Sequence, residues 1–443
     1  MDNGCTNIRI SLLAAVVAFP FGVHPVPAAQ LMAGAGREDI TPPAGFRHWA
    51  TNNATFDGVL SPLYARAMVL SDGTRKIVIL QWDLVNTRED GVAKVRGLVS
   101  AAIGVPAGNI LVNASHDHSA PCAPVPDERL VSVNEDEAVP APSESINRQW
   151  VERLYAASVA AAKAADAALR PVTVEVSRAL VPEWQYNRRP RRPDGTVTTI
   201  FEPKDPYTLP DGLRFGPMDP TVSILAFRDR ERHSLVTLFS YPCHAVSVYS
   251  YSNAACGDWP GFAEDGVEAQ VGGRAIFLQG CAGDLVPARR GIDAAREMGA
   301  LIGTRVTAAA AGGLPVDVNR LEEASSRARL PWNAAQRSKT GTDYCLAEVQ
   351  VFALGSVAIV ALPGEPMIEI AMAIQGQSPY PHTLVLGYSN GGGTIYVGMP
   401  GELARGGYET TRDSAHGTDE CGTILIDTAV SLLHEVAGRK NIP

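Results

Sequence analysis

One stretch of sequence decides the fold class and points to the site: Asn109-Ile110-Leu111-Val112-Asn113-Ala114-Ser115-His116-Asp117-His118-Ser119. Its apolar first half predicts a buried β-strand over residues 109–113. His116 and His118 then stand at the carboxyl end of that strand, where open α/β sheets hold their sites. Side chains of an extended chain alternate with a period of two, so we expect both imidazoles to project to one side. A His-x-His pair alone is more often a surface or packing pair than a metal site, so it needs partners from elsewhere in the chain.

Short apolar runs alternate with amphipathic segments on both sides of this stretch. The apolar runs predict strands over residues 64–70, 76–82, 109–113, 222–227, 235–240 and 274–278. The amphipathic segments predict helices over residues 89–103, 147–169, 261–270, 293–310, 366–375 and 423–436. This alternation is typical of an α/β fold, so we expect a mixed β-sheet sandwich flanked by helices, with the site at strand ends.

Composition excludes several classes of protein. The chain has 443 residues, 46% of them hydrophobic and 19% charged, which excludes a disordered polyampholyte and a coiled-coil rod. Its 38 basic and 47 acidic side chains give a net charge of −9 without basic runs, so we expect no nucleic-acid partner. Two segments, 121–145 and 186–216, lack periodicity and are long enough to be functional loops. No linker divides the rest, and we expect a single catalytic domain over residues 29–443.

The N-terminus has the pattern of a secretory signal peptide. Arg9 precedes a short apolar run over residues 10–19, and small residues follow at Val26-Pro27-Ala28-Ala29, which predicts a signal peptide over residues 1–28. The alternative is a frayed apolar helix, because Asp2 weakens the positive start of the pattern. We expect a secreted or periplasmic protein with no transmembrane segment in the mature chain. Six cysteines remain after cleavage, an even number that suits an oxidising compartment, and none forms a CxxC pair.

Two further residues have the chemistry that the His-x-His pair lacks. His244 follows the apolar run that ends in Ser240-Tyr241-Pro242-Cys243, and a hydrogen-bonded core histidine is an equal alternative. Glu365 follows Pro363-Gly364 after another apolar run, where it could instead cap the helix that comes next. Two or more histidines with one carboxylate are the usual ligands of a catalytic zinc that keeps an open position for water.

Motifs along the chain resemble the N-terminal catalytic domain of the neutral ceramidase family, in the family's order. They are Ala35-Gly36-Arg37-Glu38-Asp39-Ile40-Thr41-Pro42, Ser115-His116-Asp117-His118-Ser119-Ala120-Pro121, Asn187-Arg188, Gly257-Asp258-Trp259-Pro260-Gly261-Phe262-Ala263, Pro363-Gly364-Glu365, Leu386-Gly387-Tyr388-Ser389-Asn390, and Tyr396 followed by Gly407-Tyr408-Glu409. The resemblance implies zinc ligands at His116, His244, Glu365 and Tyr396. It also implies that His118, Arg188 and Tyr408 line the reacting centre.

The resemblance also has departures. The segment Gly283-Asp284-Leu285-Val286-Pro287 is similar to a Gly-Asp-Val-Ser-Pro segment of the family, but Val286 stands at the serine position. Valine cannot attack, donate or accept, so any activity must use metal-activated water. The sequence stops shortly after the segment that resembles the catalytic domain, so we expect no counterpart of the further C-terminal β-sandwich domain that ceramidases carry. Together these departures make a long-chain ceramide a doubtful substrate.

The resulting hypothesis is a secreted zinc-dependent hydrolase of a carboxamide, acting on a small N-acyl substrate, with a lipid-like molecule as one option. His118 would pass a proton to the leaving amine, and Arg188 or Tyr408 would stabilise the oxyanion. A zinc-dependent esterase or lactonase remains an alternative, since these substrates need the general acid less. A pseudoenzyme that keeps only the metal site is a second alternative. Retention of His118, Arg188, Tyr396 and Tyr408 argues against it, because a scaffold has no use for these polar groups.

Overall fold

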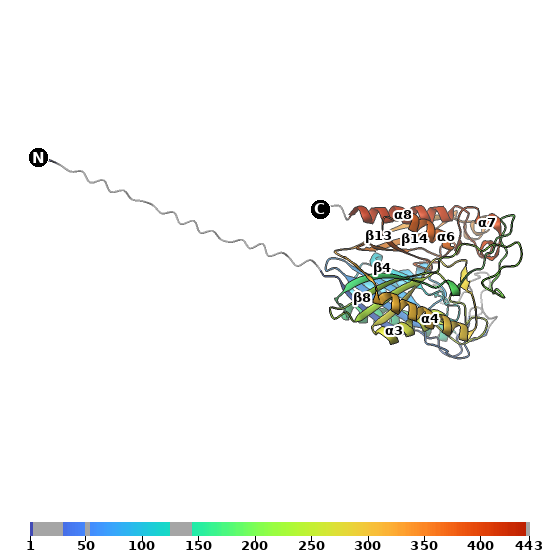
Figure 1. Cartoon of the computed structure of the whole chain (residues 1–443), viewed down its shortest axis with the longest axis horizontal. Helices are drawn as coiled ribbons and strands as arrows, with labels where there is room; N and C mark the ends of the chain where they lie inside the picture. Colours follow the sequence, from blue (N-terminus) through green and yellow to red (C-terminus); the bar gives the residue numbers. More distant parts are fainter. Residues whose placement is uncertain (3–29, 49–53, 125–143, 440–443) are drawn as a thin grey trace.

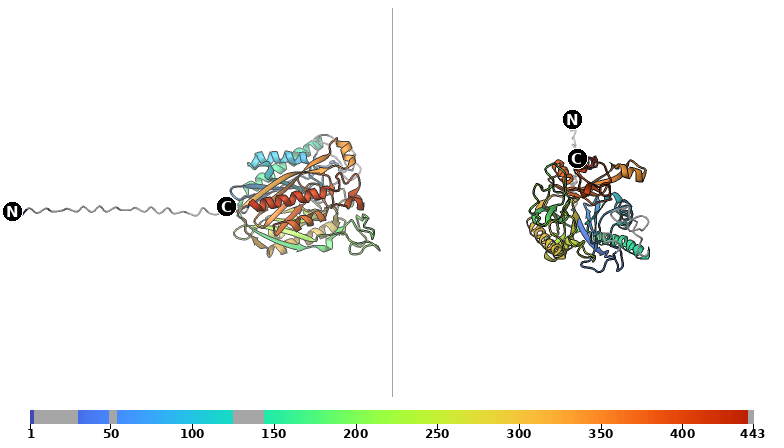
Figure 2. Two further views of the ribbon diagram at one scale, coloured as in Figure 1. Left: turned by 90° about the horizontal axis from the view of Figure 1, so that it is seen from above. Right: turned by 90° about the vertical axis from the view of Figure 1, so that its right-hand side faces the viewer.

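Three β-sheets, each with its own pair of helices, surround a shared core in the structure, a computed structural model that describes residues 1–2, 30–48, 54–124 and 144–439 (Figures 1 and 2). The first sheet has the strand order β4 (Ile110–Ala114), β3 (Lys76–Trp82), β2 (Tyr64–Ser71), β1 (Met32–Asp39), β5 (Arg170–Pro171). The second has the order β10 (Arg274–Gln279), β9 (Ser234–Tyr241), β8 (Thr221–Arg228), β6 (Thr173–Leu180), β12 (Leu314–Val316). The third has the order β13 (Leu321–Pro331), β14 (Tyr344–Leu354), β15 (Val357–Ala361), β17 (His382–Leu386).

The three sheets share one apolar core. Their inner faces meet through residues such as Ile79 of β3, Leu238 of β9 and Ile359 of β15, each almost completely buried. These strands are rich in β-branched and other apolar residues, either at alternate positions or in continuous runs. Such sequences suit strands of a pleated sheet that is covered on both faces. The expected mixed β-sheet sandwich flanked by helices is confirmed, with a third sheet added to it.

Helices cover the outer face of each sheet. The pairs are α1 (Glu89–Ile103) with α2 (Glu144–Ala167) on the first sheet, α3 (Asp258–Val271) with α4 (Ile292–Ala311) on the second, and α6 (Ile368–Gln377) with α8 (Cys421–Gly438) on the third. By length and apolar composition α8 alone among the described helices would be able to cross a membrane. However, its residues Leu425, Ala429 and Leu433 are fully buried in the core under the third sheet, as in an ordinary core helix.

Two pairs of very short strands lie outside these sheets. One is β7 (Gln185–Asn187) with β11 (Leu285–Pro287), and the other is β16 (Glu365–Pro366) with β18 (Tyr396–Val397). The expected helix over 366–375 therefore begins two residues later, because Pro366 belongs to β16. Proline has no N–H to donate to a neighbouring strand, so it is tolerated in a short edge strand but not in the middle of a sheet.

Two further expectations from the sequence concern the N-terminal and acidic segments and the pairing of the cysteines. The predicted signal peptide, except for Met1 and Asp2, and most of the segment 121–145 lie outside the described residues. All six cysteines in the described ranges are free thiols, and five are buried. Their even number therefore does not reflect a disulfide framework.

Candidate metal centre

One strand from each of the three large sheets ends near the same point in the molecule. His116 and His118 follow β4 of the first sheet, His244 follows β9 of the second, and Glu365 follows β15 of the third. The structure thus brings together residues that are far apart in the sequence. The site lies at strand ends, as the sequence predicts.

Buried amides fix these three chain segments relative to one another. Gln279, at the end of β10, donates to the carbonyl oxygens of Ser115 (3.0 Å) and Cys243 (2.9 Å), the residues just before His116 and His244. Asn113 of β4 donates to the carbonyl oxygen of Gly387, the residue just after β17 of the third sheet, at 2.9 Å. Because Asn113 and Gln279 are fully buried, these hydrogen bonds make a rigid support for the histidines. Neither amide was singled out by the sequence motifs.

His116 sits in a sharp turn and not on a strand. β4 ends at Ala114, and His116 has φ = 59°, in the left-handed region. The expectation that strand alternation aims His116 and His118 to one side is therefore wrong in its mechanism, although the two rings do face each other. The Nδ1 of His116 lies 2.6 Å from the Val85 carbonyl oxygen, which makes Nδ1 the donor and leaves Nε2 with a lone pair.

His244 is held in the same way. Its Nδ1 lies 2.7 Å from the Ala282 carbonyl oxygen and 3.0 Å from that of Leu285, so Nδ1 carries the proton. Its Nε2 is buried and has no hydrogen-bond partner within the described part of the chain. A buried, unpaired imidazole nitrogen is unfavourable unless something binds it. His244 is thus a core histidine on its Nδ1 side and a candidate ligand on its Nε2 side.

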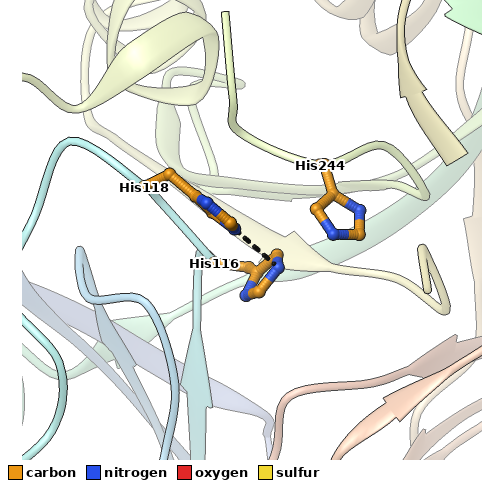
Figure 3. A group of neighbouring side chains, drawn as sticks. All are labelled: His116, His118 and His244. Atoms are coloured by element: carbon orange, nitrogen blue, oxygen red, sulfur yellow. Dashed lines mark hydrogen bonds between the residues drawn. The ribbon is translucent and has the colours of Figure 1, made fainter. Parts of the chain in front are cut away.

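The three histidines form one compact group (Figure 3). The Nε2 atoms of His118 and His116 are 3.1 Å apart, and each of the three side chains offers a nitrogen within 4.8 Å of the others. Burial lowers the pKa of His116 to about 3 and also lowers the pKa values of His118 and His244. The rings are therefore neutral at pH 7, the state in which imidazole binds a metal ion, so this group is able to hold one.

Glu365 adds a carboxylate to the two buried histidines. Its Oε2 lies 3.4 Å from Nε2 of His116 and 3.6 Å from Nε2 of His244. In a tetrahedral site with metal–ligand bonds of about 2.0–2.1 Å, the ligand atoms are separated by about 3.3–3.4 Å. Burial raises the pKa of Glu365 to about 7, and this effect outweighs the opposing hydrogen bonds from Tyr396 and Tyr388 and the charge of Arg188. The donor set and its spacing fit a divalent metal ion.

The turn before Glu365 explains why this glutamate enters the site. Gly364 has φ = +69°, and a Cβ there would lie 2.5 Å from the Ile395 carbonyl oxygen, so only glycine fits. The register of β16 and β18 then pairs Glu365 with Tyr396, which places the two side by side. Glu365 does not cap the following helix, because the N-cap of α6 is Met367 and it has no side-chain cap.

Tyr388 is a site residue to which the sequence motifs gave no role. Its ring stacks on His116 with centroids 4.1 Å apart and planes at 28°, and its hydroxyl donates to Oε2 of Glu365 at 3.4 Å. Tyr388 lay inside one of the motifs, but its contacts join segments far apart in the chain. It orients two of the candidate ligands at once.

Arg188 and Tyr408 lie beside this centre. The Nη2 of Arg188 donates to the Tyr396 hydroxyl (3.0 Å) and to the Gly283 carbonyl oxygen (2.8 Å). The Tyr396 and Tyr408 rings have centroids 5.8 Å apart, and the Arg188 guanidinium carbon is 5.6 Å from each. Burial raises the pKa of both tyrosines, so the phenols are protonated in the absence of a metal. The structure therefore brings all seven predicted site residues into one neighbourhood.

Val286 does not contribute polar chemistry. Its side chain is fully buried in an apolar cluster with Tyr186, Val246 and Ala288. The backbone around it does support the site, because the carbonyl groups of Ala282 and Leu285 hold His244.

A cavity of about 340 Å³ opens beside Glu365 and Tyr388. Trp332, Leu346 and Ile395 form the apolar part of its wall. The volume is near the lower end of the range for small-molecule pockets, about 300–1,000 Å³.

Comparisons with known proteins agree with this fold. The family described as "Neutral/alkaline non-lysosomal ceramidase, N-terminal" matches residues 31–299. The neutral ceramidase from Pseudomonas aeruginosa is similar in structure, with a TM-score of 0.71 and 18% identity over 92% of this chain and 75% of that one. A structure described as "Ceramidase complexed with C2" has a TM-score of 0.72 and 18% identity over 92% and 76% of the two chains. No curated protein matches the sequence.

Proposed function

The chain belongs to the neutral/alkaline non-lysosomal ceramidase family, and from that premise we propose that it is a zinc-dependent hydrolase of an N-acyl carboxamide. The observation that carries the proposal is the convergence of His116, His244 and Glu365 from three different sheets, at ligand–ligand distances that suit a tetrahedral metal site. Family membership gives the reaction class, and this donor set gives it a physical basis.

Zinc is the metal that we propose, with His116, His244, Glu365 and Tyr396 as its ligands. When bound, zinc lowers the pKa of water to about 7 and polarises a carbonyl group. Two neutral imidazoles and one carboxylate are its usual partners in hydrolases. Tyr396 fits as the fourth ligand because Arg188 donates to its oxygen, which favours phenolate character.

The remaining polar groups divide the work of amide cleavage. His118 is neutral and its Nε2 faces His116, so it can accept the proton that the attacking water gives up and pass this proton to the departing amine. Arg188 uses Nε and Nη2 for contacts within the protein, whereas Nη1 makes no hydrogen bond with any residue in the described ranges. We assign Nη1 of Arg188, together with the Tyr408 hydroxyl, to the developing oxyanion.

The cavity beside Glu365 supports a compact substrate. We propose that its apolar wall accepts one short chain of an N-acyl amide, since each buried methylene contributes about 0.8 kcal/mol, or about fourfold in kcat/KM. The similar ceramidase complexed with C2 supports a lipid-like amide as the substrate class.

The size of this cavity can be tested with an N-acyl series of increasing length. In the wild-type enzyme kcat/KM should rise by about fourfold per methylene until the cavity is full. Leu346→Trp should move the plateau to shorter chains, whereas Leu180→Trp, on the exposed side of β6, should leave it in place. An equal shift in both variants, or no plateau, would place the chain elsewhere.

The proposed reaction is tested by hydrolysis of matched amides and esters with the same acyl chain. We expect cleavage of both, with loss of activity on chelation and recovery with zinc. Activity on esters alone would favour the esterase or lactonase alternative. Bound metal without any turnover would favour the pseudoenzyme.

We also propose that the protein is secreted or periplasmic, because residues 1–28 have the signal-peptide pattern. Mass spectrometry of the exported protein should find a chain that begins near residue 29. Retention of Met1 in the mature protein would contradict this.

A further inference from the structure

We propose that Glu409 is a positioning residue of the site, which holds Arg188 so that its Nη1 faces the reacting group. The inference rests on the proposed function and names a residue that the reaction, as derived above, does not use. It is carried by one continuous set of buried contacts between the Arg188 segment and the Tyr408 segment.

The guanidinium of Arg188 is held along two edges. Its Nε donates to Oε1 of Glu409 at 2.6 Å, and its Nη2 donates to Gly283 and Tyr396. Because a guanidinium is planar and rigid, fixing Nε and Nη2 also fixes the direction of Nη1. Gly283 and Tyr396 hold one edge, and only Glu409 holds the other among the described residues.

Glu409 itself is unable to turn away. Its second oxygen, Oε2, accepts a hydrogen bond from Nη1 of Arg189 at 2.6 Å, and its side chain is fully buried. Arg189 is anchored in turn by Glu402, whose Oε2 lies 2.9 Å from Nη2 of Arg189. Each carboxylate oxygen of Glu409 therefore has a charged donor in a short, charge-assisted hydrogen bond.

Glu409 is also adjacent in sequence to Tyr408, the second residue that we assign to the oxyanion. It stands next to Tyr408 in the 3-10 helix Tyr408–Thr410, while Arg188 follows directly on β7. One carboxylate therefore ties together the two segments that carry Arg188 and Tyr408. A displacement of about 1 Å at such groups is enough to lower turnover by about 100-fold.

A buried ion pair can also be purely structural, so the experiment must separate the two roles. Glu402 provides the matched control. It is buried, it belongs to the same charged network, and it contacts Arg189 and Arg191, but it makes no contact with Arg188 within the described residues. Glu409→Gln and Glu402→Gln therefore each remove one negative charge from the network. Only Glu409→Gln removes it from a residue that accepts a hydrogen bond from Arg188.

We expect Glu409→Gln to lower kcat by about 10- to 100-fold, the range for a group that orients a site residue, with KM and metal content nearly unchanged. Glu402→Gln should change kcat by less than about threefold. In an Arg188→Met background, Glu409→Gln should cause almost no additional loss, because the group through which it acts is gone.

A second measurement does not depend on turnover. A short acyl phosphonate carries anionic oxygens that mimic the tetrahedral oxyanion, and calorimetry gives its affinity. Glu409→Gln should weaken its binding by the same factor as kcat. The affinity of the neutral amide should not change.

Several results would overturn the inference. Equal losses in Glu409→Gln and Glu402→Gln, or an undiminished loss in the Arg188→Met background, would make Glu409 a structural residue. If Glu409→Gln does not fold, Glu409→Asp keeps the charge on a shorter stem and should still lower kcat by at least about threefold; unchanged kcat in that folded variant would also refute the role. A wild-type enzyme that cleaves neither amides nor esters would instead refute the proposed function.

Discussion

His118→Ala separates the two metal-binding arrangements that the geometry allows. The three-histidine group includes His118, whose Nε2 is 3.1 Å from that of His116. The set that we propose replaces it with Glu365, whose Oε2 is 3.4 Å and 3.6 Å from the same atoms of His116 and His244. Removing His118 leaves the second set complete. We therefore expect the variant to bind zinc with its affinity changed by less than about threefold, far below the 10- to 100-fold typical of a disturbed site.

Turnover should behave differently from metal binding in this variant. Loss of a general acid lowers the rate by about 10²- to 10⁴-fold, which corresponds to about 2.7–5.4 kcal/mol in the barrier. An amide should show this full loss, because an unprotonated amine is a poor leaving group. An activated ester with the same acyl chain should lose much less.

The assay combines zinc affinity, from competition with a coloured chelator, with kcat/KM on the amide and ester pair. His434→Ala, on the exposed side of α8, controls for the loss of a histidine as such. Loss of zinc from His118→Ala would identify His118 as a ligand. Equal losses on amide and ester would refute its role as the acid.

Two further predictions concern the support of the site. Tyr388→Phe keeps the ring stacked on His116 and removes the hydroxyl that lies 3.4 Å from Glu365. The affinity for zinc should therefore fall by about tenfold. An unchanged affinity would show that the hydroxyl has no role. Burial raises the pKa of Asp284 from 3.8 to about 6, so its protonated form favours the folded state and stabilises it by about 3 kcal/mol at low pH. That contribution is lost as pH rises through about 6. Between pH 4 and pH 7 the free energy of unfolding, measured with denaturant, should fall by about 2 kcal/mol less in Asp284→Asn than in the wild type, because part of the contribution is already lost at pH 4. Equal losses in the two proteins would contradict the shift.

Much of the first two sheets is predictable from local sequence pattern. The strand Lys76–Trp82 and the helix Glu89–Ile103 begin and end where the apolar periodicity begins and ends. The hairpin of β13 and β14 is not evident in the sequence. β13 contains Glu, Ser and Arg on its exposed side, so its alternation is weak, and only its pairing with β14 makes it a strand.

The site divides in a similar way. His116, His244 and Glu365 follow apolar strands, and their residue types alone suggest a metal. Tyr396, Arg188 and Tyr408 lie in short or irregular segments, so only the family resemblance pointed to them. The stacking of Tyr388 and the contact of Gln279 with two separate loops depend on long-range packing, which no local pattern contains.

Titration of metal-stripped enzyme with zinc tests the central claim most directly. Amide hydrolysis is measured as zinc is added in known ratios to the folded, chelator-treated protein. The account predicts no hydrolysis at the start, a linear rise, and a plateau at about one zinc per chain, as for a single catalytic site. Hydrolysis by the stripped enzyme, or a protein that takes up zinc without gaining amidase activity, would contradict it.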